Sequence, residues 1–197
     1  MLTQALTKPF SNSWRDMAHV PRWAILRKNR TQNLAEHSYY VTLYAAHVAR
    51  IIGWEGNYAN LMRYALYHDI DETVTGDIPG PAKRVAWDKE RAEEAILPVL
   101  TAKYGQDVVD VRQGASEAIR AIVSVADSID EVCYLTDEML SGNQWVTSVK
   151  FEAVKRLKSR WDKLPADPDV LEYLWHNTMY DVTVRQELPP TLLEDKL

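Results

Sequence analysis

Two adjacent residues, His68 and Asp69, place an imidazole nitrogen and a carboxylate at one point of the chain. A histidine that is neutral near pH 7 can bind a transition metal, and an aspartate brings negative charge that offsets a divalent cation. His37 lies upstream, and two more carboxylates, Asp127 and Asp130, lie downstream. Together these residues could hold one metal ion. A mixed His and Asp set suits Zn, Mn, Fe or Co better than Ca.

The wide spacing of these residues predicts that they come from different helices. Apolar residues recur at three- and four-residue intervals and the chain has only 7 glycines, which favours an all-helical fold. His37 shares the apolar face of a helix expected over about 33 to 52, and His68 shares that of a helix over about 57 to 69. Helical bundles build metal sites from such inward-facing side chains.

The rest of the chain is expected to form helices joined by short breaks. They span about 13 to 19, 83 to 104 with Pro98 able to bend it, 107 to 140 with a break at Gly114, 145 to 164, and 169 to 180. A rigid loop with Pro79 and Pro81 is expected over about 76 to 80. We therefore predict one domain over 1–182 and a loose tail over 183–197.

Composition narrows the class of protein. The 197 residues are 46% hydrophobic and 26% charged, which is typical of a single globular unit. The formal charge of -5 argues against a protein that binds a nucleic-acid backbone. Cys133 is the single cysteine, so an intramolecular disulfide is excluded. The start lacks the pattern of a signal peptide and no apolar run is long enough for a membrane span, so we expect a cytoplasmic protein.

Periodicity does not identify the fourth metal ligand. Asp127 and Asp130 both fall near the apolar face of the helix expected over 107 to 140. A buried, unpaired carboxylate is costly, so at least one of them should meet a cation, a metal or a strong donor. A lone buried histidine such as His37 is more often a hydrogen-bonded core residue, so the metal hypothesis depends on the combination. A closed structural zinc site is disfavoured because such sites usually use several cysteines.

Five short blocks stand in order along the chain: Arg22-Trp23, Ala35-Glu36-His37-Ser38, Tyr67-His68-Asp69 with Glu72, Thr75-Gly76-Asp77 with Pro79, and Ala126-Asp127. In this order and spacing they resemble the HD-domain phosphohydrolases, and specifically the bacterial 5'-deoxynucleotidases of the YfbR type. The resemblance selects Asp127 over Asp130, because the family's Ala-Asp pair stands at a similar distance before a Gly-Asn pair, here Gly142-Asn143.

The resemblance implies a fold, a metal and catalytic residues. The fold would be a single all-α HD-domain bundle of about six to eight helices. A divalent transition metal, with Zn, Co or Mn expected and Mg as an option, would be held by His37, His68, Asp69 and Asp127. Glu72 would be the catalytic carboxylate that positions or deprotonates water.

The resemblance also implies a substrate site. Arg22 offers a fork of donors suited to a phosphate and is counted among the catalytic residues with Glu72 and Asp77. Trp23 would crowd the ribose 2' position, and Ile25 could crowd the base edge. Asp77 would contact the sugar hydroxyl or assist the leaving oxygen, beside Pro79 on the same loop.

The function implied is hydrolysis of 5'-deoxynucleoside monophosphates to deoxynucleoside and phosphate. A close alternative comes from related phage enzymes of the 2-aminoadenine pathway, which cut dATP to deoxyadenosine and triphosphate. A third hypothesis is a nucleotide or metal sensor without turnover, against which Glu72 and Asp77 argue. Asp71, an extra charge beside Glu72, leaves the substrate preference open. We expect a small-molecule nucleotide partner and a homo-oligomer, with no polymeric nucleic acid and no membrane, in the cytoplasm or in the host cytoplasm if the protein is phage-encoded.

Overall fold

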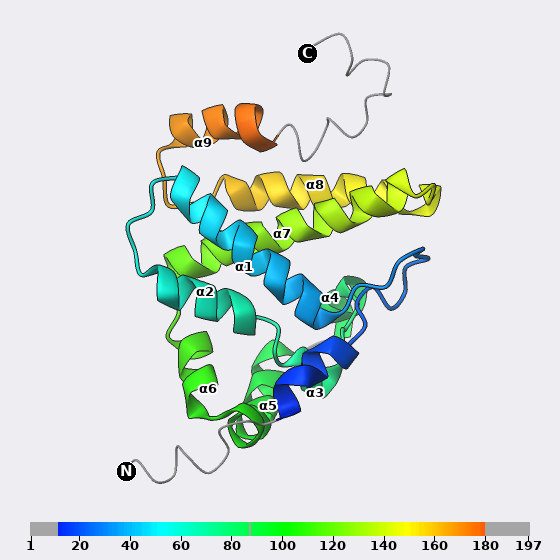
Figure 1. The fold of residues 1–197 in the computed structure, drawn as a ribbon, viewed down its shortest axis with the longest axis vertical. Coiled ribbons are helices and arrows are strands. Elements are labelled where there is room, and N and C mark those ends of the chain that lie inside the picture. The colour runs from blue at the N-terminus through cyan, green and yellow to red at the C-terminus, as the bar shows by residue number, and fades with distance from the viewer. Residues whose placement is uncertain (1–11, 87, 180–197) are drawn as a thin grey trace.

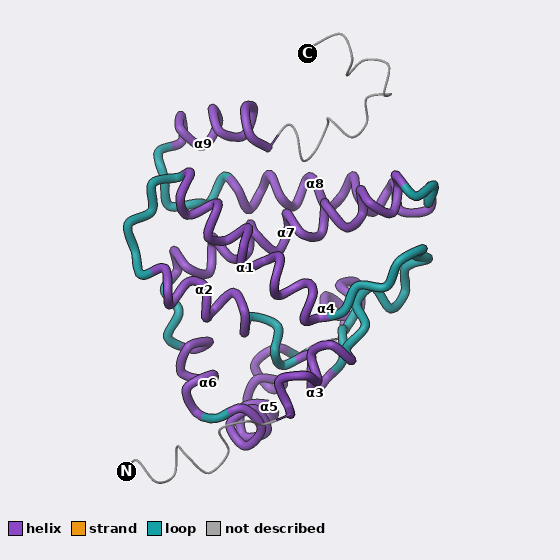
Figure 2. The backbone as a smooth tube through the Cα atoms, viewed as in Figure 1, coloured by secondary structure: helices purple, strands orange, loops and turns teal. Residues whose placement is uncertain are grey.

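The described part of the chain is helical throughout. A computed structural model describes residues 12–86 and 88–179, and within these ranges the chain forms nine α-helices and no strand (Figure 2). The α-helices are α1 Leu34–Ile51, α2 Tyr58–Tyr67, α3 Glu72–Thr75, α4 Gly80–Ala86, α5 Lys89–Tyr104, α6 Gln106–Gln113, α7 Glu117–Leu140, α8 Thr147–Trp161 and α9 Pro168–Leu174. Helical segments of other types are η1 Asn12–His19, η2 Gln144–Val146 and η3 Trp175–Met179. The all-α prediction is confirmed.

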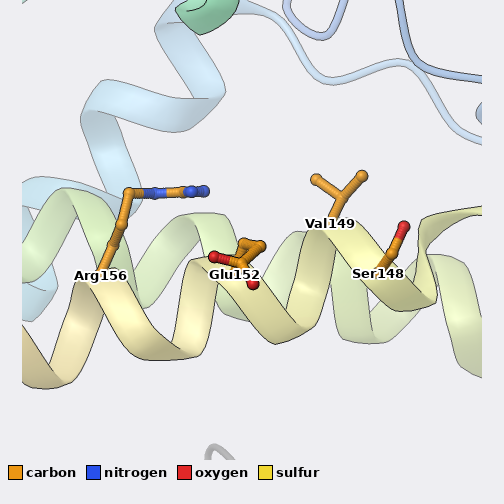
Figure 3. Close-up of a pocket in the computed structure, with 4 residues that line it drawn as sticks. All are labelled: Ser148, Val149, Glu152 and Arg156. Carbon is orange, nitrogen blue, oxygen red and sulfur yellow. The ribbon is translucent and has the colours of Figure 1, made fainter.

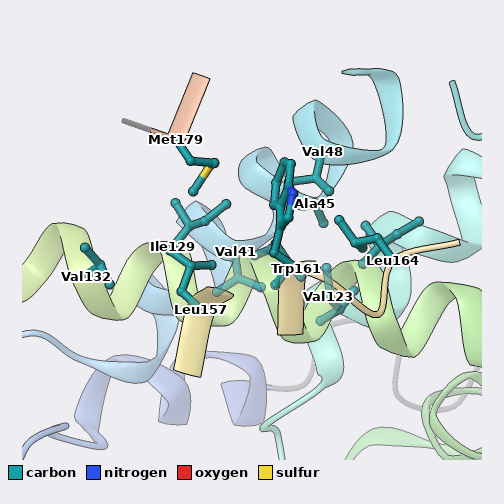
Figure 4. Packing of buried hydrophobic residues seen from close by; sticks show 14 of the residues in the cluster. Val41, Ala45, Val48, Val123, Ile129, Val132, Leu157, Trp161, Leu164 and Met179 are labelled. Carbon is teal, nitrogen blue, oxygen red and sulfur yellow. The ribbon is translucent and has the colours of Figure 1, made fainter. Parts of the chain in front are cut away.

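Helix α7 is the longest element and organises the larger core. It packs along α1 on one side and along α8 on the other (Figure 1). Ser116 caps its start by accepting a hydrogen bond from the backbone N–H of Ile119. Buried residues from α1, α7 and α8 meet around Trp161, which has no exposed surface (Figure 4). Its indole Nε1 donates to the carbonyl of Leu171, which ties α9 to the bundle.

A second, smaller core lies beneath α1 and α2. It joins η1, α5 and α6 to the start of α1 through residues such as Leu34, Ile70 and Leu100. The larger core begins about two turns further along α1, at Val41. His37 lies between Leu34 and Val41, so α1 carries this histidine to the boundary between the two cores.

The structure differs from the expected elements in two places. The helix expected over 83 to 104 is two helices, α4 and α5, because Asp88 acts as an N-cap whose side chain accepts from the backbone N–H of Arg91. Helix α5 continues through Pro98. The short helix α3 was not expected. The break expected at Gly114 is present between α6 and α7.

The ends of the chain leave two expectations open. Residues 180–197 lie outside the described part of the chain, so the predicted tail over 183–197 stays a prediction. Among the described residues, none of the helices is long and apolar enough to cross a membrane.

Candidate metal centre and active site

Helix α1 places His37 in the interior with one ring nitrogen turned away from its hydrogen-bond partner. Asn33 caps the helix by accepting from the backbone N–H of Glu36, and His37 follows in the first turn with no exposed surface. Its Nδ1 lies 2.6 Å from Oδ2 of Asp130. An ionised carboxylate only accepts, so Nδ1 carries the proton and Nε2 keeps its lone pair. Such a ring is oriented to bind a cation through Nε2.

His68 is arranged in the same way at the end of α2. Its Nδ1 lies 2.7 Å from the carbonyl oxygen of Ala65, which can only accept a hydrogen bond. In a neutral ring this leaves the lone pair on Nε2. Arg112 donates to the carbonyl of His68 over 3.3 Å and to Oδ1 of Asp71 over 2.8 Å, which holds the turn after α2 against α6.

The two histidines meet two carboxylates at one point. Ligand atoms of His37, His68 and Asp69 all lie within 4.8 Å of one another, an arrangement that could hold a metal ion. Oδ2 of Asp69 is 3.2 Å from Nε2 of His68 and 3.7 Å from Nε2 of His37. Oδ1 of Asp127 is 3.5 Å from Nε2 of His37. The structure therefore brings His37, His68 and Asp69 together as one group and places Asp127, the fourth predicted ligand, against His37.

The buried ring nitrogens make this set fit a cation. Neither Nε2 atom makes a hydrogen bond of good geometry with a described residue, although both are buried. A buried polar atom without a partner is costly, and a bound cation would satisfy both. Two imidazoles and two carboxylates are a donor set typical of Zn, Co or Mn sites.

The charges around this point also favour three of the four candidate ligands, His37, Asp69 and Asp127, in their metal-binding forms. Burial and then the neighbouring guanidinium of Arg22 lower the pKa of His37, although Asp130 opposes them. Burial would raise the pKa of Asp69, but His68 and then Arg22 hold it well below its usual value. The pKa of Asp127 is also lowered, by His37 against the effect of burial. A neutral His37 and two ionised aspartates result. Against the effect of burial, Asp69 and then Asp127 raise the pKa of His68 to about 9, so a metal would have to displace the proton of this ring.

Asp127 and Asp130, which periodicity could not separate, contact opposite nitrogens of the same ring. Asp130 faces Nδ1 of His37, whereas Asp127 faces Nε2. Asp127 is in turn held by Arg160 of α8, whose Nη1 donates to its Oδ2 over 2.8 Å. Arg160 was not among the residues predicted from the sequence, and no motif around it indicates this contact.

Glu72 lies beside this cluster in the first turn of α3. It is buried, and its Oε1 accepts from Nζ of Lys83 over 3.0 Å. Its Oε2 is 3.7 Å from Nη1 of Arg22 and makes no hydrogen bond with a described residue. Burial and then the charge of Asp69 raise the pKa of Glu72 to about 7. A carboxylate with a pKa near neutrality can exchange protons at working pH.

Arg22 and Trp23 precede α1 and approach the cluster from the loop over 21–33. Nη1 of Arg22 lies 3.4 Å from Oδ2 of Asp69. Trp23 adopts a left-handed backbone with φ 63°, and its N–H donates to Oδ2 of Asp77 over 2.7 Å. Gly76, at φ 74°, ends α3 in a conformation that glycine adopts readily and so directs Asp77 toward this loop. Arg22, Trp23 and Asp77 therefore lie together.

The loop is anchored at its far end by a buried carboxylate. Glu138, near the end of α7, accepts from the backbone N–H groups of Asn29 and Arg30 over 2.7 and 2.8 Å. The side chain of Asn143 donates to Glu138 and to the carbonyl of Arg27. The Gly-Asn pair that helped select Asp127 thus supports the loop that carries Arg22.

A cavity of about 470 Å³ opens beside the cluster. Its walls include His68, Asp69 and Glu72, three basic residues and several apolar ones. The basic residues are Lys83, Arg112 and Arg120, and the apolar ones include Ile78, Ile96 and Leu97. This volume suits a small-molecule ligand.

A second hollow has a different character. It lies on the surface of α8 and is lined by Ser148, Val149, Glu152 and Arg156 (Figure 3). All four residues come from one helix, and Arg156 is paired with Glu131 of α7. It offers no group of metal ligands.

The other predicted residues fall around the loops. Ile25 is 72% exposed, and Pro79 is half-buried immediately before α4. Asp71, the extra charge noted beside Glu72, is paired with Arg112. Lys83 and Arg112 were missed, because their helices place them through packing that no sequence motif marks.

Comparison with known proteins identifies the family of the chain. The family model of the YfbR-like 5'-deoxynucleotidases matches residues 9–170. A 5'-deoxynucleotidase of Pectobacterium atrosepticum is 32% identical over 157 residues, which cover 72% of this chain and 78% of the relative. One from Photorhabdus temperata is 32% identical over 158 residues, covering 72% and 79%.

Solved structures share the fold. An HD-domain phosphohydrolase of Listeria innocua aligns with a TM-score of 0.69 at 21% identity, covering 92% of this chain and 94% of that one. The HD phosphohydrolase DatZ of cyanophage S-2L, bound to dA and one catalytic Zn²⁺ ion, aligns with a TM-score of 0.67 at 20% identity, covering 86% and 94%. With the family model matching most of its length, the chain belongs to the YfbR-like 5'-deoxynucleotidases.

Proposed function

We propose that this protein is a metal-dependent phosphohydrolase that converts 5'-deoxynucleoside monophosphates to deoxynucleoside and phosphate. The observation that carries the proposal is the convergence of two unpartnered imidazole nitrogens and two carboxylates next to Glu72. The names of the family and of its curated members support the substrate class.

His37, His68, Asp69 and Asp127 would hold the metal. Zn, Co or Mn fit this donor set best, and Mg is a further option. The Zn²⁺ ion bound in the DatZ structure supports the same choice of metals. A divalent cation here would add positive charge beside the phosphoryl oxygens and acidify water.

Glu72 would act on the attacking water. Its Oε1 is engaged by Lys83, so Oε2 is the atom available to orient the water and to accept its proton. A pKa raised to about 7 makes Glu72 a stronger base than an ordinary glutamate once it is ionised.

Arg22, Trp23 and Asp77 would bind the rest of the substrate. Arg22 would donate to phosphate oxygens, and in doing so exchange part of its contact with Asp69 for the substrate. The bond between the backbone N–H of Trp23 and Asp77 holds this residue and the carboxylate close together, where the indole could crowd the 2' position and Asp77 could contact a sugar hydroxyl. Ile25 and Pro79 would complete this side of the site.

The alternative substrate is a deoxynucleoside triphosphate, which the basic residues of the cavity suggest. Lys83 and Arg112 are already paired, with Glu72 and Asp71. Arg120 is the remaining basic residue of the cavity, and it donates to Tyr64 and to backbone carbonyls. A single phosphate needs less free positive charge than three, so we favour the monophosphate.

A nucleotide panel with product identification tests the proposal. Protein loaded with Zn, Co, Mn or Mg is incubated with dAMP, AMP and dATP, and the products are separated by chromatography. We expect deoxyadenosine and phosphate from dAMP, with AMP cleaved more slowly. Free triphosphate from dATP without cleavage of dAMP would replace the proposal by the alternative. Binding of nucleotides without turnover under every metal would instead indicate a sensor.

A further inference from the structure

A continuous chain of hydrogen bonds links Trp23 to the buried ring of His37. Nε1 of Trp23 donates to Oε1 of Gln32 over 3.1 Å. Nε2 of Gln32 donates to Oδ2 of Asp130 over 2.8 Å, and the same oxygen lies 2.6 Å from Nδ1 of His37. Gln32, Asp130 and His37 are all buried, with 1%, 4% and 0% of their surface exposed. Water does not compete for these bonds.

The chemistry of the donors fixes the direction of every link. An indole N–H can only donate, so Trp23 requires the oxygen of the Gln32 amide to face it. The amide nitrogen then faces Asp130, which receives hydrogen bonds from both Gln32 and His37. Without the indole, the amide oxygen would lose its partner and only the bond to Asp130 would hold the end of this side chain. The tryptophan thus determines how firmly Asp130 is held against His37.

Three contacts fix the position of Trp23, so a movement of this residue would alter the position of its partners. Its backbone N–H binds Asp77, and its ring stacks on Tyr134 at 5.2 Å between centroids and 7° between planes. Its indole N–H then binds Gln32. A displacement of the ring would therefore be felt at Gln32.

We propose that Gln32 is a positioning residue that couples Trp23 to His37. The position of the Trp23 ring and the affinity of the site for metal therefore depend on each other. The proposal rests on the proposed function for the roles of Trp23 and His37. Gln32 touches neither metal nor substrate in it. It acts by keeping Asp130 aligned with Nδ1 of His37, because partners of this kind orient a histidine ligand.

Metal affinity measured without substrate tests the coupling. Zn²⁺ is titrated against a chromophoric chelator in the full-length wild type, Gln32→Leu, Trp23→Phe and the double variant. We expect Gln32→Leu to weaken Zn²⁺ binding by about tenfold, the lower end for such outer partners. Trp23→Phe keeps an aromatic ring but loses the indole donor, and should weaken binding by about two- to tenfold, as the loss of one hydrogen bond does.

The double variant provides the decisive comparison. If Trp23 acts through Gln32, adding Trp23→Phe to Gln32→Leu should change the affinity no further. Trp54→Phe, at a tryptophan outside this network, is the matched control and should bind Zn²⁺ like the wild type. An unchanged affinity in Trp23→Phe, or two effects that multiply in the double variant, would overturn the coupling.

Two further measurements keep the outcome clear. Thermal unfolding of each metal-free variant shows whether it folds. If Gln32→Leu does not fold, the Zn²⁺ affinity of Trp23→Phe alone tests the coupling. That substitution lies at the half-exposed end of the chain of hydrogen bonds. Metal affinity is measured without turnover. If the wild type binds Zn²⁺ but hydrolyses no deoxynucleotide, the proposed function fails while the coupling can still hold.

Discussion

Arg160 on α8 donates to Oδ2 of Asp127 on α7 over 2.8 Å, which leaves Oδ1 of that aspartate facing His37. The same Nη1 donates to the hydroxyl of Ser128 and the carbonyl of Ser124, so the guanidinium is fixed on the surface of α7. Arg160 thereby determines which carboxylate oxygen points to the candidate metal centre.

The first prediction removes this contact. Arg160→Met should weaken metal binding by about tenfold, because an unsupported Asp127 can rotate away. Chelator competition measures the affinity. Lys158→Met, which removes a cation of the same helix that pairs with Asp162 and Glu172, is the control and should leave the affinity unchanged. Tighter binding in Arg160→Met would show that the arginine competes with the metal instead of orienting its ligand.

The second prediction separates the roles of two neighbouring carboxylates. Asp69→Ala should lose the metal, whereas Glu72→Ala should keep it and lose about 100- to 10,000-fold in kcat, the range expected for a general base. Metal content per protein and steady-state kinetics on dAMP measure the two effects. Equal loss of metal in both variants would contradict the assignment of Glu72.

The third prediction concerns pH. Burial and then Asp69 raise the pKa of Glu72 to about 7, while Arg22 and Lys83 lower it. A base must be deprotonated, so activity should rise with pH through this pKa. Lys83→Met removes a cation 3.0 Å from Oε1 and raises the pKa further, which should move the acidic limb of kcat/KM to higher pH.

Lys103→Met is the matched control for this shift, because Lys103 pairs with Asp16 and should leave the limb in place. A limb that stays fixed in Lys83→Met, or moves to lower pH, would rule out Glu72 as the group that titrates.

The fourth prediction addresses the core. Trp161 is fully buried and its indole bonds to the carbonyl of Leu171. Trp161→Ala should lower the free energy of unfolding by about 3–5 kcal/mol, the usual cost of removing a large buried aromatic side chain. Urea denaturation measures the change. Phe151→Ala, at a 62% exposed site of the same helix, should change stability by about 0.5 kcal/mol or less.

The sequence predicted the elements that carry the candidate ligands because those elements are amphipathic. The spacing of apolar residues gave α1 and α2 to within a few residues, and with them the inward direction of His37. It could not separate Asp127 from Asp130, because residues three apart on a helix face nearly the same way. Only the position of the His37 ring, seated between them, distinguishes the two carboxylates.

Other contacts depend on tertiary packing that leaves no periodic trace. Arg160 and Lys83 reach the site from helices whose own faces give no reason to expect it. Gln32 lies in a loop, where periodicity carries no information. The start of α5 is different, because Asp88 is a capping residue that could have been recognised.

Helix α7 fixes the distance between two carboxylates as well as their contacts. Asp127 faces the candidate metal centre, and Glu138 anchors the loop that carries Arg22 and Trp23. Since a helix rises 1.5 Å per residue, these two residues are separated by about 16 Å along the axis of a nearly rigid helix. Inserting one residue between them would turn Glu138 by about 100° relative to Asp127 and withdraw its anchor. The helix therefore sets the distance from the candidate metal centre to the loop over 21–33, and an insertion between Asp127 and Glu138 should be tolerated poorly.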